Sequence, residues 1–363
     1  MLAFTPGLEL CRRFYEEAVR PLLVQHFPDL PYAAALIGPG SDVLGFDTEM
    51  SMDHFWGPRL QIFLRDQDIP FASRIDEMLR NSLPHIFEGF PVDVVEVPDE
   101  PGVTLMHLTH EGQVNHHVTF LTLQDFLQSR LAYDINQPLE AADWLTFPAQ
   151  TLREITAGAV YHDGVGELTA LRTRLAWYPH DVWLYLLASG WQRIGQEEHL
   201  MPRAGYVGDE LGSAIIGSRL VRDIMYLCFL MEKHYAPYPK WFGSAFKQLQ
   251  CAQNLWPILW RAQQSSIWQE REAALCEAYS FLAHMHNALG ITRKLPETVS
   301  PFYARPFKVI RSDVFVQALL EQITDSSIKH LTKRRLIGNI DQFSDSTDLR
   351  DASWRLVLRK LYE

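Results

Sequence analysis

The stretch YAAALIGPGSDVLGFDTEMSMDH, residues 32–54, decides the fold prediction. It begins with the short apolar run of residues 32–38 and continues into the turn Gly38-Pro-Gly-Ser41. An apolar run of this length that stops at turn residues is typical of a buried strand feeding a tight turn. Residues 60–64, Leu-Gln-Ile-Phe-Leu, predict a second strand soon after it. The centre of the predicted fold is therefore strand, glycine turn, strand.

Helices and strands are mixed on both sides of this centre. Residues 7–27 predict an amphipathic helix, because Leu10, Phe14, Ala18 and Leu22 recur at a spacing of four, and Pro21 is expected to end or kink it. Residues 72–83 predict another helix, and residues 92–97 and 118–122 predict further strands. This mixture indicates a small sheet covered by helices.

After about residue 124 the strand-like alternation gives way to helical spacing. The segments with this spacing are residues 183–193, 213–234, 241–264 and 267–289. We therefore predict an α+β fold, in which a small mixed sheet is followed by a large all-helical region. The predicted domains are residues 1–130 and residues 131–363.

Composition limits the possible functions. The 363 residues are 47% hydrophobic and carry a net charge of −11, which argues against bulk binding of nucleic acid. The four cysteines form no C-x-x-C pair, so we expect reduced thiols. No apolar run approaches the roughly 18 residues of a membrane span, and charges appear early at the N-terminus. We expect a cytoplasmic protein without a membrane partner.

The central stretch also suggests phosphate chemistry. A turn at Gly40 lets backbone N–H groups approach a phosphate, and the hydroxyl of Ser41 can bind the same phosphate. The carboxylate of Asp53 can hold Mg²⁺ that bridges phosphates. The alternative is an ordinary strand-turn-helix in which Ser41 and Asp42 cap the helix.

This arrangement resembles the DNA-polymerase-β-like nucleotidyltransferase superfamily, in which Gly-Ser, a short helix and a carboxylate pair on the next strand follow in order. Ser51-Met-Asp-His-Phe-Trp-Gly-Pro-Arg59 is also similar to a signature of the bacterial domain of unknown function 4037. Further stretches that look like this family are Tyr161-His-Asp-Gly164, Trp177-Tyr-Pro-His-Asp-Val-Trp183, Gly205-Tyr-Val-Gly-Asp-Glu-Leu-Gly-Ser213, Tyr235-Ala-Pro-Tyr-Pro-Lys-Trp241, His286-Asn-Ala-Leu-Gly290 and Asp341-Gln-Phe343.

The resemblance implies a sheet of nucleotidyltransferase type, with a nucleoside triphosphate and Mg²⁺ as cofactors. The implied reaction transfers a nucleoside monophosphate to an unknown small-molecule or protein acceptor. Phe55 departs from the pattern, because the family has a second carboxylate there. Asp47 and Glu49 are possible substitutes, and we assign Asp53 and Asp47 as metal ligands. The alternative is a catalytically degenerate nucleotide-binding or regulatory protein, so whether the chain is an enzyme stays open.

Other residues have a functional and a structural interpretation. Arg59 is assigned to the triphosphate, with a salt bridge as the alternative. Glu210, or its neighbour Asp209, is assigned as general base, with helix capping as the alternative. Lys240 is assigned to a phosphate within an aromatic loop. Asp93 and Glu96 are candidates for a third carboxylate, or are simply solubilising charges.

Histidines also cluster in the predicted sheet region. His116 and His117 are adjacent and therefore point to opposite faces of a strand, so we do not expect them to share a zinc ion. A last reading of the whole chain is an interaction protein whose helical region binds a partner.

Overall fold

The computed structural model describes residues 4–52, 55–97 and 104–363, and these residues divide into two compact units. The first unit is Met1–Pro138 together with Thr151–Ala176. The second unit is Leu139–Gln150 together with Trp177–Glu363. The division falls elsewhere than the predicted boundary at residue 131, because a strand from beyond that boundary returns to the first unit.

The first unit contains a four-stranded mixed sheet in the order β7-β2-β1-β8. Its strands are β1 (Tyr32–Leu36), β2 (Arg59–Leu64), β7 (His117–Leu121) and β8 (Ala159–Asp163). β1 pairs antiparallel with both β2 and β8, whereas β2 pairs parallel with β7. The predicted strands at residues 32–38, 60–64 and 118–122 correspond to β1, β2 and β7. β8 was not predicted, because its five residues are half-buried and show no alternation.

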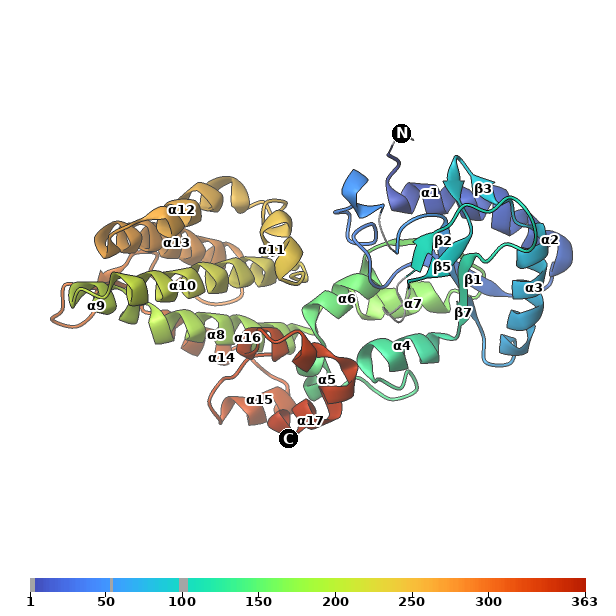
Figure 1. Ribbon diagram of the computed structural model, residues 1–363. Helices are drawn as coiled ribbons and strands as arrows, with labels where there is room; N and C mark the ends of the chain where they lie inside the picture. The colour runs from blue at the N-terminus through green and yellow to red at the C-terminus, as the bar shows by residue number, and fades with distance from the viewer. Residues whose placement is uncertain (1–3, 53–54, 98–103) are drawn as a thin grey trace. The chain divides into compact units, whose positions relative to one another are not determined.

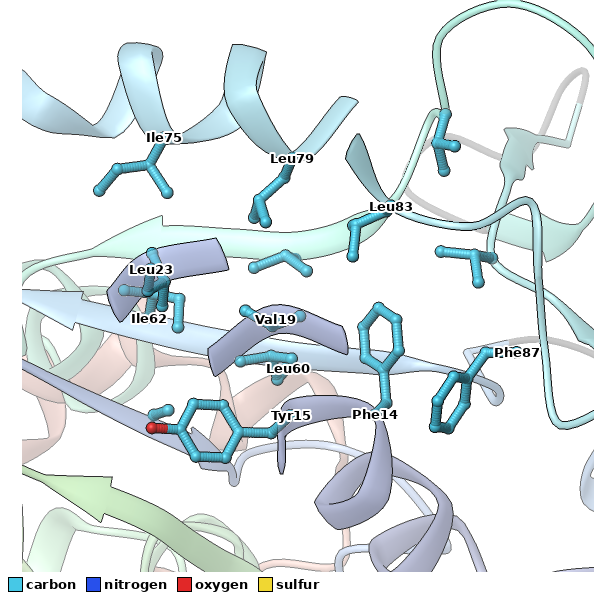
Figure 2. Packing of buried hydrophobic residues seen from close by; sticks show 14 of the residues in the cluster. Phe14, Tyr15, Val19, Leu23, Leu60, Ile62, Ile75, Leu79, Leu83 and Phe87 are labelled. Atoms are coloured by element: carbon cyan, nitrogen blue, oxygen red, sulfur yellow. The ribbon is translucent and has the colours of Figure 1, made fainter. Parts of the chain in front are cut away.

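Helices from the N-terminal part cover one face of this sheet (Figure 1). α1 (Gly7–Arg13), a π-helical turn (Phe14–Val19) and α2 (Arg20–His26) form one continuous helix, with Pro21 in the first turn of α2. Figure 2 shows Phe14, Val19 and Leu23 packed against Leu60 and Ile62 of β2. Ile75 and Leu79 of α3 (Ala72–Ser82) close the same core, which confirms the amphipathic helices predicted there.

Short elements complete the unit. β3 (Ile86–Phe87) pairs with β4 (Phe90–Pro91), and β5 (Val94–Glu96) pairs with β6 (Thr104–Met106). α4 (Leu123–Leu131) follows β7, and α7 (Glu167–Arg174) follows β8. α6 (Ala149–Thr156) precedes β8.

The second unit is built from helices, as predicted. Its longer helices are α8 (His180–Glu197), α10 (Glu210–Met231), α12 (Ala252–Gln264) and α13 (Trp268–Ala288). The shorter ones are α5 (Ala141–Thr146), α9 (Leu200–Tyr206), α11 (Pro239–Phe246), α14 (Ser312–Leu320), α15 (Ser326–Thr332), α16 (Ile340–Phe343) and α17 (Arg355–Arg359). Its strands are the two-residue pair β9 (Ser300–Pro301) and β10 (Lys308–Val309). The α+β class is confirmed.

α10 packs against α8 and α13, and α12 packs against α13 (Figure 1). α8 and α10 are rich in buried apolar residues, which explains their density of aromatic and aliphatic side chains in the sequence. In the described stretches of the chain, we find no helix with the length and apolar character needed to cross a membrane.

Candidate functional site

The loop that follows β1 is fixed by the side chain of Gln61. Its carboxamide accepts a hydrogen bond from the N–H of Ile37 (3.0 Å) and donates one to the carbonyl of Ile37 (2.8 Å). Gln61 thus continues the pairing of β2 with the chain one residue beyond β1. The N–H of Gly38 then donates to the carbonyl of Glu154 (2.8 Å). The start of the loop is held from two sides.

Gly40 is required by the conformation of this loop. Its φ is +150°, and a Cβ built there would lie 2.3 Å from Oδ1 of Asp42 and 2.6 Å from Nη2 of Arg59. The carbonyls of Gly40 and Ser41 accept from the N–H groups of Leu44 (3.2 Å) and Phe46 (2.8 Å). Residues 41–45 form consecutive turns, so the turn predicted at Gly40-Ser41 is present but the helix expected directly after it is not.

Backbone donors remain available in the same loop. Among the described residues, the N–H groups of Gly40, Ser41 and Asp42 find no acceptor, and the hydroxyl of Ser41 makes no hydrogen bond. Gly40 and Ser41 are both half-buried. Successive N–H groups without internal acceptors form a concavity suited to an anion.

Arg59 lies beneath this loop in a buried ion pair. Its Nη2 donates to Oδ1 (2.7 Å) and Oδ2 (2.9 Å) of Asp42, and the two residues are 8% and 2% exposed. The salt bridge that the sequence left as an alternative is therefore formed. Nε of Arg59 is also buried and has no hydrogen-bond partner. Because a buried N–H is costly to leave unpaired, this atom is a second place where an acceptor is missing.

Of the two predicted metal ligands, the structure describes Asp47. Asp53 and His54 lie outside the described residues. Oδ2 of Asp47 accepts from the N–H of Gly7 (2.7 Å) and the indole of Trp56 (3.3 Å), so Asp47 holds the start of α1. Phe55 has a φ of +51° and is 39% exposed.

No group of three or more His, Cys, Asp or Glu side chains is placed to hold a metal ion within residues 4–52, 55–97 and 104–363. The residues that the structure describes do not by themselves assemble a magnesium site.

The candidates for a third carboxylate lie outside the four strands of the sheet, although Asp93 forms an isolated β-bridge with His116, directly before β7. Asp93 is buried and accepts from the N–H of Asn115 (3.0 Å), and its Oδ2 lies 3.0 Å from Nδ1 of His85. Burial opposes its charge, but hydrogen bonds from Thr109, Asn115 and His85 hold the pKa of the Asp93 carboxyl below its usual value. Glu96 ends β5, which pairs with β6. Asp93 therefore has a structural explanation.

One face of the sheet beside the loop is polar. Arg59 and Gln61 alternate along β2, and they are in register with His117 and Thr119 of β7. Residues in register on paired strands share a face, so these four side chains form one strip, here called the polar face. Gln61 and His117 are half-buried and Thr119 is exposed. Gln61 was not predicted as a site residue and His117 was considered only for zinc, although polar residues at i and i+2 in an otherwise apolar strand are a readable signal.

The remaining predicted site residues belong to the second unit. Asp209 is the N-cap of α10 and accepts from the N–H of Gly212 (2.8 Å). Oε1 of Glu210 accepts from the N–H of Trp268 (3.1 Å), and its Oε2 lies 3.4 Å from Arg271. Lys240 is exposed on α11, with its Nζ 5.0 Å from the ring centroid of Trp241. Asp209 thus has the capping role, and Glu210 holds the start of α13.

Carboxylates of the other family-like motifs hold helix ends and loops. Asp163 accepts from the N–H groups of Gly166 and Thr169 at the start of α7, both at 2.8 Å. Asp181 accepts from the N–H groups of Thr324 (2.7 Å) and Asp325 (2.5 Å). These motifs are accounted for by backbone capping.

Comparison with known proteins gives a match to a family model over part of the chain. Residues 144–242 match the family model described as "Domain of unknown function (DUF4037)". The resemblance inferred from the motifs is thereby confirmed over this segment. The DUF4037 segment includes the Tyr161, Trp177 and Gly205 motifs and ends just after Trp241. Curated proteins give no match.

One solved structure is similar to this chain. It is described as a nucleotidyltransferase-like protein from Exiguobacterium sibiricum, and it is 11% identical. The alignment covers 76% of this chain and 77% of that chain, with a TM-score of 0.33. A likeness at this level carries no argument about the function of the present protein.

Proposed function

We propose that the first unit binds a nucleoside triphosphate at the loop of residues 38–42 and transfers a nucleoside monophosphate to a small-molecule or protein acceptor. One observation carries the proposal: three successive backbone N–H groups, from Gly40 to Asp42, have no acceptor among the described residues. Such N–H groups in a glycine turn bind phosphate oxygens. Ser41 adds a hydroxyl at the same place.

The metal part of the proposal rests on the sequence. Asp53 would anchor Mg²⁺, which prefers oxygen ligands and is usually held by one or two carboxylates plus phosphates. Asp47, the second ligand assigned from the sequence, is engaged by Gly7 and Trp56 through one oxygen. Glu210, which the resemblance suggests as general base, lies in the second unit, where both of its oxygens already face donors.

The alternative is a catalytically degenerate nucleotide-binding or regulatory protein. Phe55 favours it, because a phenyl ring cannot ligate a metal at the position of the expected second carboxylate. In both readings the loop binds the nucleotide. They differ only in whether transfer follows binding.

The test is Phe55→Asp, compared with the wild type and with the uncharged control Phe55→Asn. We expect weak transfer of α-labelled nucleotide by the wild type and stronger transfer by Phe55→Asp, because a second carboxylate would complete the metal pair. Phe55→Asn should stay near the wild type. Transfer would be followed with and without Mg²⁺, beside nucleotide binding by calorimetry.

Equal, robust transfer by all three proteins would mean that another residue already supplies the second ligand, with Glu49 the first to examine. Metal-independent binding without transfer by any of them would favour the regulatory reading. An absence of nucleotide binding in the wild type would remove the proposal.

A further inference from the structure

His117 occupies the first position of β7, directly opposite Arg59 in the parallel register with β2. Its ring therefore lies on the polar face, on the same side of the sheet as Arg59 and Gln61. The ring centroid of Phe55 is 6.5 Å from that of His117. Arg59 in turn reaches the loop, because its Nη2 would lie 2.6 Å from a Cβ at Gly40. A continuous path thus runs from Gly40 through Arg59 to His117.

The imidazole of His117 is uncharged at neutral pH. Burial lowers the pKa of His117 to about 4, and the nearby charges of Arg59 and His116 act in the same direction. A neutral imidazole has one N–H donor and one bare nitrogen. In the described part of the chain, neither ring nitrogen of His117 makes a hydrogen bond. Its neighbour His116 is different, since its Nδ1 accepts from the N–H of Val118 (3.2 Å).

Arg59 supplies a second donor without an acceptor. The residue is only 8% exposed, and its buried Nε has no hydrogen-bond partner. Its Nη2 donates to Asp42. The polar face therefore holds a buried N–H from Arg59 and, at the paired position of β7, an imidazole N–H from His117. Asp42 already neutralises the charge of Arg59, but the two N–H groups still lack a hydrogen-bond acceptor. An oxygen that only accepts hydrogen bonds fits this demand.

We infer that His117 contacts a phosphate oxygen of the nucleotide, together with Nε of Arg59, and so extends the anion site from the loop onto the polar face. This inference rests on the proposed function, because it needs a phosphate chain held at residues 38–42. The loop N–H groups bind one part of that chain, and His117 binds an oxygen further along it. His117 is thus a contact residue for the triphosphate and has no part in holding the metal.

The experiment measures binding of ATP and of inorganic tripolyphosphate to the full chain by calorimetry. His117→Ala is expected to weaken both by roughly ten- to a hundredfold, the usual effect of losing one hydrogen bond to a charged group. His117→Gln keeps an N–H donor and is expected to bind nearer to the wild type. His26→Ala is the matched control, since His26 is exposed at the end of α2 and should leave binding unchanged.

The outcomes separate this inference from the proposed function. Failure of the wild type to bind either compound overturns both. Binding by the wild type with an unchanged affinity in folded His117→Ala overturns only the inference. Should His117→Ala not fold, the imidazole resonances of His117 in the wild type decide instead. A shift on addition of tripolyphosphate supports the contact, and unchanged resonances at saturation contradict it.

Discussion

The loop of residues 37–46 and the turn of residues 205–213 have similar sequences but differ in how many of their backbone N–H groups have hydrogen-bond acceptors. Both contain glycines, a serine and at least one acidic residue. In the turn, the N–H groups of Gly208, Asp209, Gly212 and Ser213 donate to nearby oxygens, and only those of Glu210 and Leu211, in the first turn of α10, have no acceptor among the described residues. In the loop, those of Gly40, Ser41 and Asp42 have no acceptor within the described residues. A Gly-Ser-acid pattern therefore indicates an anion site only where the fold leaves successive backbone N–H groups without acceptors.

This difference assigns distinct roles to the two units. Carboxylates of the family-like motifs in the helical unit accept backbone N–H groups, so substituting them should change stability. Residues around the loop in the sheet unit hold or present donors, so substituting them should change nucleotide binding. The predictions below test this separation.

The largest effect is expected for Asp341→Ala in the helical unit. Asp341 is buried, accepts from the N–H of Ala149 (2.7 Å), and lies 3.3 Å from the buried guanidinium of Arg350. Removing it leaves Arg350 without its counter-charge, which costs about 3–5 kcal/mol of unfolding free energy. Urea unfolding measures the loss, and nucleotide affinity of the folded protein should not change.

Asp345→Ala is the control for this variant. Asp345 pairs with Arg222 but its side chain is 75% exposed, so its removal should cost less than about 1 kcal/mol. A tenfold loss of nucleotide affinity in folded Asp341→Ala would break the separation of roles, because a helical-unit motif would then contribute to binding.

For Gln61→Met we expect a smaller loss of unfolding free energy than for Asp341→Ala, together with a loss of nucleotide affinity. This substitution keeps the length of the side chain but leaves the buried N–H and C=O of Ile37 without their partners. We expect a loss of roughly 2 kcal/mol in unfolding free energy. Because the loop is then free to move from β2, nucleotide affinity should also fall several-fold at temperatures where the variant is fully folded.

Thr119→Val tests whether the effect belongs to Gln61 itself. Thr119 lies on the same polar face but is exposed, so this variant should stay within about 0.5 kcal/mol of the wild type and keep its affinity. If Gln61→Met lost stability but bound ATP as tightly as the wild type, the loop would not depend on its anchor.

A change that depends on pH is expected from Glu198, a carboxyl in the helical unit that is buried and hydrogen-bonded. It accepts from the N–H of Ile310 (2.7 Å), and burial raises the pKa of Glu198 from its usual 4.5 to about 7. The folded protein then binds more protons than the unfolded chain between these two values. Stability from this group is therefore full below pH 4.5 and is lost as the pH rises through 7.

Glu198→Gln isolates this contribution, because an amide oxygen still accepts from Ile310 but does not titrate. Relative to the wild type, the variant should become more stable as the pH rises from 5 to 8, by on the order of 1–3 kcal/mol. The difference between the two proteins is the quantity to measure, since burial lowers the pKa of His286 to about 4 and gives the opposite slope. A difference independent of pH would contradict the assignment.

Much of the fold could be predicted because its signals are local. The apolar run at residues 32–38, the turn glycines and the spacing of Leu10 and Phe14 each reflect the conformation of the residues that carry them. The same holds for α10 and α13, whose helical periodicity extends over many turns. Asp209 could be predicted as a cap for this reason, since a cap bonds to its own helix.

What the sequence by itself determined was the order of strand, glycine turn and strand, the helical second unit, and the resemblance of residues 144–242 to the DUF4037 family model. Tertiary structure decided which groups meet. β8 joins β1 from more than a hundred residues away, and its short, half-buried sequence gives no sign of that partner. Asp47 bonds Gly7, Asp42 pairs with Arg59, and His117 lies in register with Arg59. Such contacts depend on strand register and helix packing, which set the positions of distant side chains and leave no periodic trace in the chain.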